Sequence, residues 1–338
     1  MADEIESASH REGSMRHTKL GPDVLDIDYV AEAARIARWM VDTLANQLHR
    51  RGVVVSMSGG IDSSACAALA VHALGPKKVL GILLPERDSS SFSLERGRLL
   101  AEHLGIDYKI HDIAPALEAL RCYEERDQAI KRVFKDYGDG WKNKIVIAGG
   151  TEGGINFFKL VVQSPDGQQH EARLPVREYL QIVAATNFKQ RVRKTMDYFH
   201  ADRLNYAVIG TPNRLEYDQG FFVKNGDGSA DLKPIAHLYK TQVYGMARHF
   251  GLPEEVCNAT PTTDTYTLAQ GQDEFYFALP YQQMDIALWA HNHGYSAAEL
   301  GEAIGIGEVQ AQRVYRDIEA KRHATRYLHA APALVESI

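Results

Sequence analysis

VSMSGGIDSSA, residues 55–65, is the stretch that decides the fold of this chain. It follows the β-branched run RGVVV, which favours a buried strand, and it precedes ACAALAVHAL, which favours a helix. Gly59 and Gly60 therefore lie in a strand-to-helix turn, where glycine lets the backbone approach a ligand closely. Because the free amides and the positive end of the following helix would face an anion, the turn predicts a phosphate site.

Strand and helix patterns alternate on both sides of this turn. The patterns predict helices over 26–49, 61–74 and 93–105, and strands over 53–57, 77–85, 107–113 and 204–211. This alternation predicts an α/β fold with a doubly wound parallel sheet that carries helices on both faces. In such a sheet we expect the ligand site at the carboxyl ends of the strands.

The alternation breaks between residues 121 and 185. KNKIVIAGG, NFFKLVVQ and SPDGQQHEARLPV predict extended segments, the last two joined as a hairpin across Pro165-Asp166-Gly167. We therefore expect a β-rich insertion over 121–185, followed by a helix over 187–203. The other expectations are a flexible tail over 1–20, a single domain over 21–338 and a helical C-terminal region over 282–330.

The composition is that of an ordinary globular protein. The chain has 338 residues, of which 45% are hydrophobic, and a net charge of −6. This charge argues against a general nucleic-acid binder, which needs a basic face. Three scattered cysteines without metal-ligand spacing predict reduced thiols and a cytoplasmic protein. No apolar stretch reaches about 18 residues, so we expect no membrane span.

Side chains around the glycine turn strengthen the phosphate interpretation. Ser58, Ser63 and Ser64 offer hydroxyls, and Asp62 lies in the first helical turn, where a carboxylate could hold magnesium against phosphates. The Lys-Ser/Thr ending of a Walker A loop is missing, and so is a G-x-G-x-x-G dinucleotide pattern. Transfer of a γ-phosphate is therefore not indicated.

SGGIDSS, residues 58–64, resembles the pyrophosphate-binding loop of the ATP pyrophosphatases, which cleave ATP between its α and β phosphates to adenylate a substrate. A second stretch, IGTPNRLEYDQGFFVKNGDGSADLKPIAHLYKTQVYGMARHFGLP (209–253), resembles the long signature of the NAD synthetases within that group. The resemblance covers about 25–120 and 185–330 and leaves the insertion outside. It implies a ligase that adenylates nicotinic acid adenine dinucleotide with ATP and then lets ammonia displace AMP to give NAD.

The resemblance also implies roles for individual residues. Asp62 and Glu216 match the positions that bind Mg²⁺. The residues that match the site of ATP and pyrophosphate are Ser58, Gly59, Gly60, Asp62, Ser63, Ser64, Thr211, Lys240 and Thr262. Among them, the implied catalytic residues are Asp62, Lys240 and Thr262. The implied contacts to the dinucleotide substrate are Arg191, Arg193, Lys224, Asp227 and Lys321.

No residue needs to act as a nucleophile, because the substrate carboxylate attacks directly and positioning and charge stabilisation carry the rate. Family members are typically homodimers with the dinucleotide across the interface, so the resemblance implies a homodimer. Ala320 stands where the family commonly has a histidine, while Lys321 and Arg322 keep the basic character. The chain has no room for a glutaminase domain, so we expect it to use free ammonia or ammonia from a partner.

Other interpretations stay open at this point. The first is a related amide-forming enzyme that adenylates a different carboxylate, with the insertion and the tyrosine-rich segment 264–281 shaping its pocket. The second is a DNA-binding regulator, because YSAAELGEAIGIGEVQAQRVYRD (295–317) has helix-turn-helix spacing. A third is a protein that only binds the nucleotide, against which the presence of Asp62 and Glu216 argues.

Overall fold

A parallel sheet of four strands forms the centre of the molecule. The computed structural model describes residues 19–148, 157–259, 266–268, 276–277 and 279–336. The strand order is β3-β2-β1-β7, and all neighbours are parallel. The strands are β1 (Val53–Ser56), β2 (Val79–Leu83), β3 (Asp107–Ile110) and β7 (Ala207–Ile209). The central strands are buried on both faces, which explains their continuous apolar sequences.

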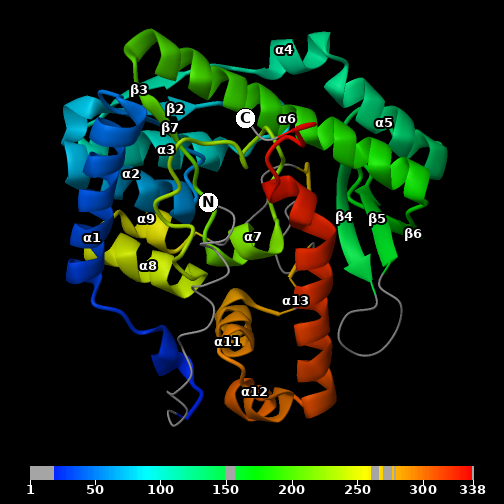
Figure 1. Ribbon diagram of the computed structural model, residues 1–338. Helices are drawn as coiled ribbons and strands as arrows, with labels where there is room; N and C mark the ends of the chain where they lie inside the picture. The colour runs from blue at the N-terminus through cyan, green and yellow to red at the C-terminus, as the bar shows by residue number, and fades with distance from the viewer. Residues whose placement is uncertain (1–18, 149–156, 260–265, 269–275, 278, 337–338) are drawn as a thin grey trace.

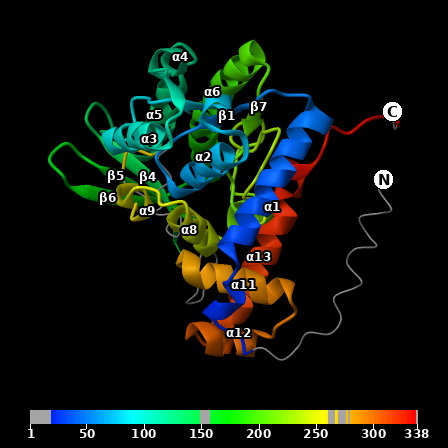
Figure 2. The same ribbon diagram turned by 90° about the vertical axis from the view of Figure 1, so that its left-hand side faces the viewer.

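Helices cover both faces of this sheet, which confirms the doubly wound prediction (Figures 1 and 2). One face carries α1 (Tyr29–Asp42), α2 (Ile61–Leu74), α3 (Ser91–Leu104) and α8 (Lys240–His249). The other carries α4 (Ala114–Ala119), α5 (Cys122–Val133) and α6 (Val176–Leu204). Alternation along β1 divides the two cores, because Val53 and Val55 enter the first and Val54 enters the second.

The first helix is shorter than its apolar pattern predicts. The range 26–49 contains α1 and a following π-helical turn, η3 (Thr43–Leu48). The carboxylate of Asp28 accepts hydrogen bonds from the amides of Val30 and Ala31, both at 3.0 Å, and so caps the helix start. At the other end, His49 adopts a left-handed conformation with φ of 52° and ends the helical backbone.

The insertion contains a second sheet of three antiparallel strands, as predicted. Its strands are β4 (Lys142–Ala148), β5 (Phe157–Gln163) and β6 (Gln169–Arg173). The hairpin between β5 and β6 closes at the predicted turn, where the amide of Gly167 donates to the carbonyl of Ser164 at 2.9 Å. Gly167 has φ of +90°, a conformation that glycine adopts without strain.

The two ends of the predicted insertion are helical. α5 occupies its start, and α6 begins at Val176 instead of near Asn187. The start was hidden because the first turns of α6 bury Glu178 and expose Val176 and Leu180, the reverse of an amphipathic pattern. The sequence prediction for the start of this helix was therefore wrong.

Helices also form the C-terminal region, as predicted. They are α11 (Tyr281–Asn292), α12 (Ala297–Ile304) and α13 (Glu308–His329), which share a core with the short α7 (Arg214–Gln219). A further short helix, α9 (Glu254–Cys257), packs on the first core. The flexible tail expected over 1–20 lies outside the described residues except for its last two positions, and Leu20 is buried in the C-terminal core.

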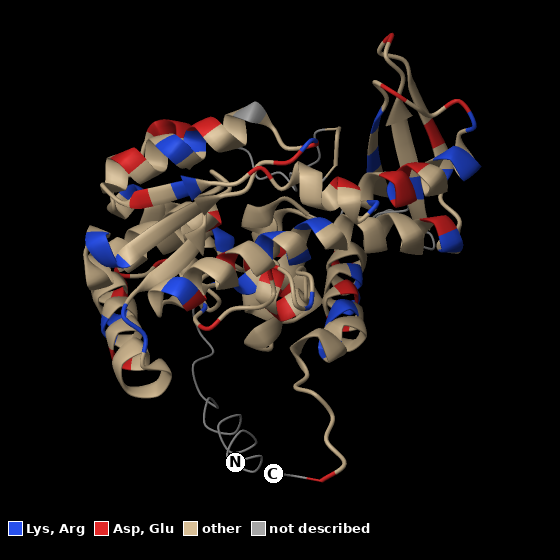
Figure 3. Cartoon of the chain, turned by 90° about the horizontal axis from the view of Figure 1, so that it is seen from above, with Lys and Arg blue, Asp and Glu red and all other residues tan. Residues whose placement is uncertain are grey.

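Cys66, Cys122 and Cys257 are buried and form no disulfide, which agrees with the reduced state predicted from the sequence. Figure 3 shows acidic and basic residues mixed along most of the helices that it draws. Across the described ranges, none of the helices has the length and apolar character that a membrane span requires.

Candidate active site

A cavity of about 940 Å³ opens at the carboxyl ends of β1, β2 and β7. This volume lies at the upper end of the roughly 300–1,000 Å³ range of small-molecule sites. Its walls come from the loop after β1, from α6, from the insertion and from α13. The position matches the expectation for a doubly wound sheet, where strand ends form the ligand site.

The glycine turn forms part of the cavity wall. Ser58, Gly60 and Ser63 line the cavity, and the hydroxyls of Ser58 and Ser63 lie 3.3 Å apart. Ser63 and Ser64 donate to the carbonyl of Gly60 at 3.0 and 2.8 Å. Ser64 is fully buried, and neither it nor Gly59 belongs to the cavity lining. These two residues shape the loop, whereas the other three face the ligand space.

Asp62 and Lys240 form an ion pair between the first turns of α2 and α8. The Lys240 ammonium donates to Asp62 Oδ2, and the Asn213 amide donates to Asp62 Oδ1 at 2.9 Å. Burial lowers the pKa of Lys240, but the carboxylates of Asp62 and Glu216 outweigh it and leave that pKa raised. The ammonium therefore stays charged beside the phosphate-binding turn.

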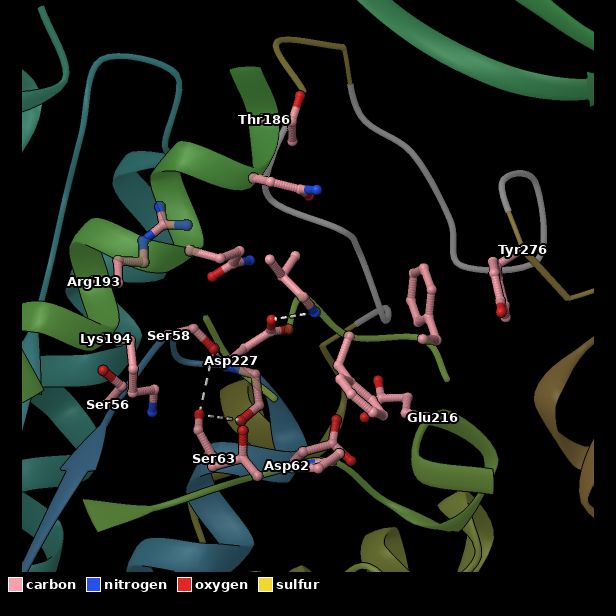
Figure 4. A pocket seen from close by; sticks show the side chains of 18 of the residues that line it. Ser56, Ser58, Asp62, Ser63, Thr186, Arg193, Lys194, Glu216, Asp227 and Tyr276 are labelled. Atoms are coloured by element: carbon pink, nitrogen blue, oxygen red, sulfur yellow. Dashed lines mark hydrogen bonds between the residues drawn. The ribbon is translucent and has the colours of Figure 1, made fainter. Parts of the chain in front are cut away.

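Glu216 lies on the same cavity, from the first turn of α7 (Figure 4). It forms a capping box with Asn213, in which each side chain accepts from the other residue's amide at 3.2 Å. Asn213 therefore contacts both carboxylates, that of Asp62 through its side-chain amide and that of Glu216 through its backbone amide. The described residues hold no cluster of three His, Cys, Asp or Glu side chains arranged for a metal. A Mg²⁺ site needs only one or two carboxylates when phosphates supply further oxygens.

Asp285 of α11 holds the start of α8 and was missed by the sequence analysis. Its Oδ1 accepts from the amide of Lys240 at 3.1 Å, and its Oδ2 accepts from the amide and hydroxyl of Thr241, both at 2.6 Å. Asp285 is fully buried. Its partners lie more than 40 residues away in the sequence, so no local motif marks it.

We expect Asp285→Ala to lower the free energy of unfolding by about 2–4 kcal/mol, because two buried amides of α8 lose their acceptor. Chemical denaturation monitored by circular dichroism measures the change. Asp285→Asn keeps one acceptor oxygen and is the matched control, for which we expect a smaller loss. Equal losses in the two variants would show that the carboxylate oxygens do not cap this helix.

The cationic residues of α6 divide between the cavity and the protein interior. Arg191 and Arg193 line the cavity, as their predicted binding role requires. Lys189 points away from it and is 1% exposed, with its ammonium 3.0 Å from Glu86 Oε1 and 2.7 Å from Asp88 Oδ2. The predicted helix begins at 187, just before these cations, whereas in the structure they lie in the middle of α6.

The buried cluster around Lys189 fixes the loop that follows β2. Arg126 of α5 also pairs with Asp88, and Tyr123 donates to Glu86 at 2.8 Å. Ser89 of the same loop lines the cavity and accepts from Arg193 at 3.4 Å. Charges outside the cavity therefore set the position of one of its walls.

The stability that this cluster contributes to the fold depends on pH through Asp88. Burial raises its pKa, but the charges of Lys189 and Arg126 outweigh burial and leave the pKa lowered. A lowered pKa in the folded state means that ionised Asp88 stabilises the fold above its unfolded pKa of about 3.9. This contribution is lost as the pH falls through the folded pKa.

We therefore expect Asp88→Asn to have a lower free energy of unfolding than the wild type at neutral pH. As the pH falls below about 4, the variant should lose less of this free energy than the wild type does. Urea denaturation between pH 2 and pH 7 measures both curves. The exposed Asp107→Asn serves as the matched control, and its curve should follow the wild type. Parallel curves for Asp88→Asn and the wild type would contradict the ion-pair assignment.

A second polar chain connects α6 to the end of β1. Ser56 donates to Asp197 Oδ1 at 2.6 Å, and the Lys194 ammonium lies 3.0 Å from Asp197 Oδ2. All three residues line the cavity. Figure 4 shows Arg193 and Lys194 extending from α6, with Lys194 next to Ser56. Sequence reasoning missed Asp197, because a single acid inside a charged helix carries no distinguishing signal.

Lys224, Asp227 and Lys321 also line the cavity. The Lys224 ammonium donates to the carbonyls of Tyr327 and Ala330, at 2.7 and 3.0 Å, and so connects its loop to the end of α13. The carboxylate of Asp227 accepts from the amide four residues earlier at 2.7 Å, and burial raises its pKa. These loop residues are held by the backbone around them.

Lys321 reaches the cavity from α13. Its ammonium donates to the carbonyl of Tyr276 and to Asp317 Oδ2, both at 2.5 Å, and burial lowers its pKa. The neighbouring Arg322 pairs with Asp218 instead. One face of α13 is buried in the C-terminal core and another lines the cavity, so this helix does not present a DNA-reading face. This arrangement argues against the regulator interpretation.

The structure thus brings most of the predicted site residues to one cavity. Thr211 lines it at the end of β7. Thr262 lies outside the described residues, so its role stays a prediction. The predicted residues that line the cavity are Ser58, Gly60, Asp62, Ser63, Arg191, Arg193, Thr211, Glu216, Lys224, Asp227, Lys240 and Lys321.

Comparisons with known proteins point to one family for this chain. The profile described as NAD synthase matches residues 32–136 and 159–327, so the similarity extends further into the insertion than the sequence motifs indicated. The NH(3)-dependent NAD(+) synthetase of Rhizobium meliloti (strain 1021) is 56% identical over 317 residues, which are 94% of this chain and 95% of that protein. The synthetase of the same name from Thermotoga neapolitana is 36% identical over 239 residues, covering 70% and 76% of the two chains.

Solved structures share the fold. NMN synthetase from Francisella tularensis matches with a TM-score of 0.63 at 22% identity, over 93% of this chain and 100% of the other. NH3-dependent NAD synthetase from Campylobacter jejuni matches with a TM-score of 0.60 at 20% identity, over 92% and 100%. The family profile and the Rhizobium relative confirm the resemblance stated from the two motifs. The chain therefore belongs to the NAD synthase family.

Proposed function

We propose that this chain is an ammonia-dependent NAD synthetase, a carbon–nitrogen ligase that uses ATP as co-substrate and nicotinic acid adenine dinucleotide as acceptor. One observation carries the proposal. The phosphate-binding turn and the long second motif meet in one cavity, where Asp62 of the turn forms an ion pair with Lys240 of the motif. The chain that holds this pair is 56% identical to a protein named for this activity.

In the first step the nicotinate carboxylate attacks the α-phosphorus of ATP. A carbon–oxygen–phosphorus linkage forms, and the bond to the leaving pyrophosphate breaks with its electron pair. The amides of the turn at Ser58–Ser63 and the Lys240 ammonium stabilise the negative charge that develops on the leaving group. Arg193 and Lys194, which line the cavity from α6, reduce the repulsion between carboxylate and phosphate.

In the second step ammonia attacks the acyl carbon. A carbon–nitrogen bond forms, AMP leaves with the electron pair of the carbon–oxygen bond, and the nitrogen loses a proton to give the amide. Because ammonia is small and neutral, this step needs the acyl-adenylate held in place more than it needs a further catalyst. We assign that binding to the residues predicted from the motifs, Arg191, Lys224, Asp227 and Lys321.

We further propose that Asp62 and Glu216 hold Mg²⁺ together with the phosphates of ATP. Both carboxylates line the cavity and share Asn213 as a partner, which fits a hard cation with few protein ligands. Bound there, the ion would supply charge neutralisation on the phosphates. We also propose that the protein is a homodimer in the cytoplasm, and light scattering of the purified protein tests the dimer.

Turnover tests the function. Purified protein should convert ATP, Mg²⁺, ammonium and nicotinic acid adenine dinucleotide into equal amounts of NAD and AMP, followed by chromatography. Glutamine in place of ammonium should give no product with the purified chain alone. Formation of AMP without NAD, or no product from protein that binds ATP, would contradict the proposal and favour a different carboxylate substrate.

A further inference from the structure

A distant segment of the chain covers the edge of the insertion's sheet at Asn143. The strand order is β4-β5-β6, and β6 lies on the outside of the molecule (Figures 1 and 2). An edge strand such as β4 carries amides and carbonyls that no neighbouring strand pairs. The backbone amide of Asn143 donates to Thr267 Oγ1 at 2.6 Å, and its carbonyl accepts from the amide of Leu268 at 3.1 Å. Residues 266–268 therefore pair with β4, although Thr267 follows Asn143 by 124 residues.

The side chain of Asn143 strengthens this contact from inside the protein. Asn143 is fully buried, and its Nδ2 donates to the hydroxyl of Tyr137 at 2.7 Å and to Thr267 Oγ1 at 3.2 Å. The hydroxyl of Thr267 in turn donates to the carbonyl of Asn143 at 3.4 Å. Tyr137 is 3% exposed, so the carboxamide of Asn143 is held on two sides by buried or half-buried partners. We name Tyr137, Asn143 and Thr267 the anchor.

The anchor holds a residue of the cavity wall. Tyr266, directly before Thr267, lines the cavity and is 7% exposed. Its ring belongs to a core that also contains Ile145 of β4 and Ile182 of α6. Burial raises the pKa of the Tyr266 hydroxyl, and a hydrogen bond with Thr186 of α6 partly offsets this shift. Tyr266 therefore connects the insertion to α6 at the cavity.

Building on the proposed function, we propose that Asn143 is a positioning residue for the ligase reaction, because it holds residues 266–268 on β4 and so places Tyr266 in the cavity wall. Its backbone amide, carbonyl and carboxamide all contact this segment. Tyr137 and Asn143 lie within 137–158, the stretch that the family profile leaves unmatched, whereas 266–268 belongs to the matched part. A strand outside the profile thus fixes a cavity wall inside it.

A purely structural role is the competing explanation. Asn143 would then stabilise the insertion without any effect on substrate binding. The two explanations differ in kinetics, because a displaced wall weakens binding of substrate and transition state equally and so raises KM while kcat stays the same. A loss of global stability instead reduces the amount of folded enzyme, which lowers the apparent kcat and leaves KM unchanged.

Thr267→Val tests the proposal, since valine keeps the branched shape of threonine and removes only the hydroxyl that Asn143 contacts. We expect amide hydrogen exchange in peptides that contain residues 266–268 to become about 5- to 100-fold faster, because a buried polar contact is lost. The KM of at least one substrate, ATP or the dinucleotide, should rise about 10- to 100-fold, with kcat within about twofold of the wild type.

Thr267→Ser is the matched control, because serine keeps the hydroxyl and should restore the exchange rate and both KM values. Asn143→Ala removes the carboxamide from the other side of the contact. In the double variant Asn143→Ala and Thr267→Val, the KM should rise by less than the product of the two single effects, since both changes act on one contact. Thermal unfolding verifies that each variant is folded.

Unchanged exchange in 266–268 of Thr267→Val, or KM values within about twofold of the wild type, would overturn the proposal. A lower kcat with unchanged KM values would also overturn it, in favour of the purely structural role. A wild type that forms no NAD would contradict the proposed function alone. The Kd values of ATP and the dinucleotide, measured by calorimetry, would then replace the KM values, and the exchange measurement would test the anchor as before.

Discussion

Asp62→Asn should form NAD about 100- to 1,000-fold more slowly than the wild type, the effect of removing one preorganised charged contact from a reaction centre. Asn fills the same space but cannot neutralise the buried ammonium of Lys240, which would lose the carboxylate that it contacts. The Asn213 amide would also lose a charged acceptor. Steady-state kcat at saturating ATP and dinucleotide measures the loss.

Asp42→Asn, which removes an exposed carboxylate from the end of α1, is the control and should leave kcat unchanged. The free energy of unfolding must be measured in parallel, because an unpaired buried charge destabilises a fold by about 3–5 kcal/mol. A folded Asp62→Asn enzyme with kcat within about threefold of the wild type would exclude Asp62 from the reaction centre.

The metal assignment has its own readout in the same variant. If Asp62 and Glu216 hold Mg²⁺, Asp62→Asn and Glu216→Gln should both raise the Mg²⁺ concentration that gives half-maximal rate. Variants with low kcat but an unchanged Mg²⁺ requirement would restrict the role of Asp62 to its contact with Lys240.

Gly59→Ala should disrupt the phosphate-binding turn, with a loss of about 2–4 kcal/mol in the free energy of unfolding and at least a tenfold rise in the KM of ATP. Gly59 has φ of +73°, where a side chain costs roughly 1–2 kcal/mol. A Cβ there would lie 2.8 Å from both the Cβ of Arg96 and the carbonyl oxygen of Ser93. The turn must therefore move away from α3, and its amides move with it.

Gly105→Ala separates the cost of the positive φ from the cost of the close contact with α3. Gly105 has φ of +65°, but a Cβ there would have no neighbour within 4 Å. In this control the free energy of unfolding should fall only by the roughly 1–2 kcal/mol that a side chain costs at positive φ, and the KM for ATP should equal that of the wild type. Equal effects of the two substitutions on stability and on KM would show that contact with α3 does not constrain the turn. Denaturant unfolding and initial rates measure both quantities.

The amino-acid sequence by itself determined the α/β class, the position of the site at strand ends and the membership of the family. These inferences rest on contiguous segments, since neighbouring residues determine a buried strand, a glycine turn and the helix after it. The hairpin at Pro165-Asp166-Gly167 was also predictable for this reason, because turn chemistry is local. Motifs at 58–64 and 209–253 were enough to name the reaction.

Only the tertiary structure decided which side chains face the ligand space. Lys189 and Arg193 lie one turn apart on α6, yet the first is buried against two acids and the second lines the cavity. Asp285 gains its role from amides more than 40 residues away, and Phe158 of the insertion lines the cavity where it stacks on Tyr179 of α6. The physical reason is that burial and pairing depend on segments distant in the chain, whereas sequence periodicity records only which face of a single element is apolar.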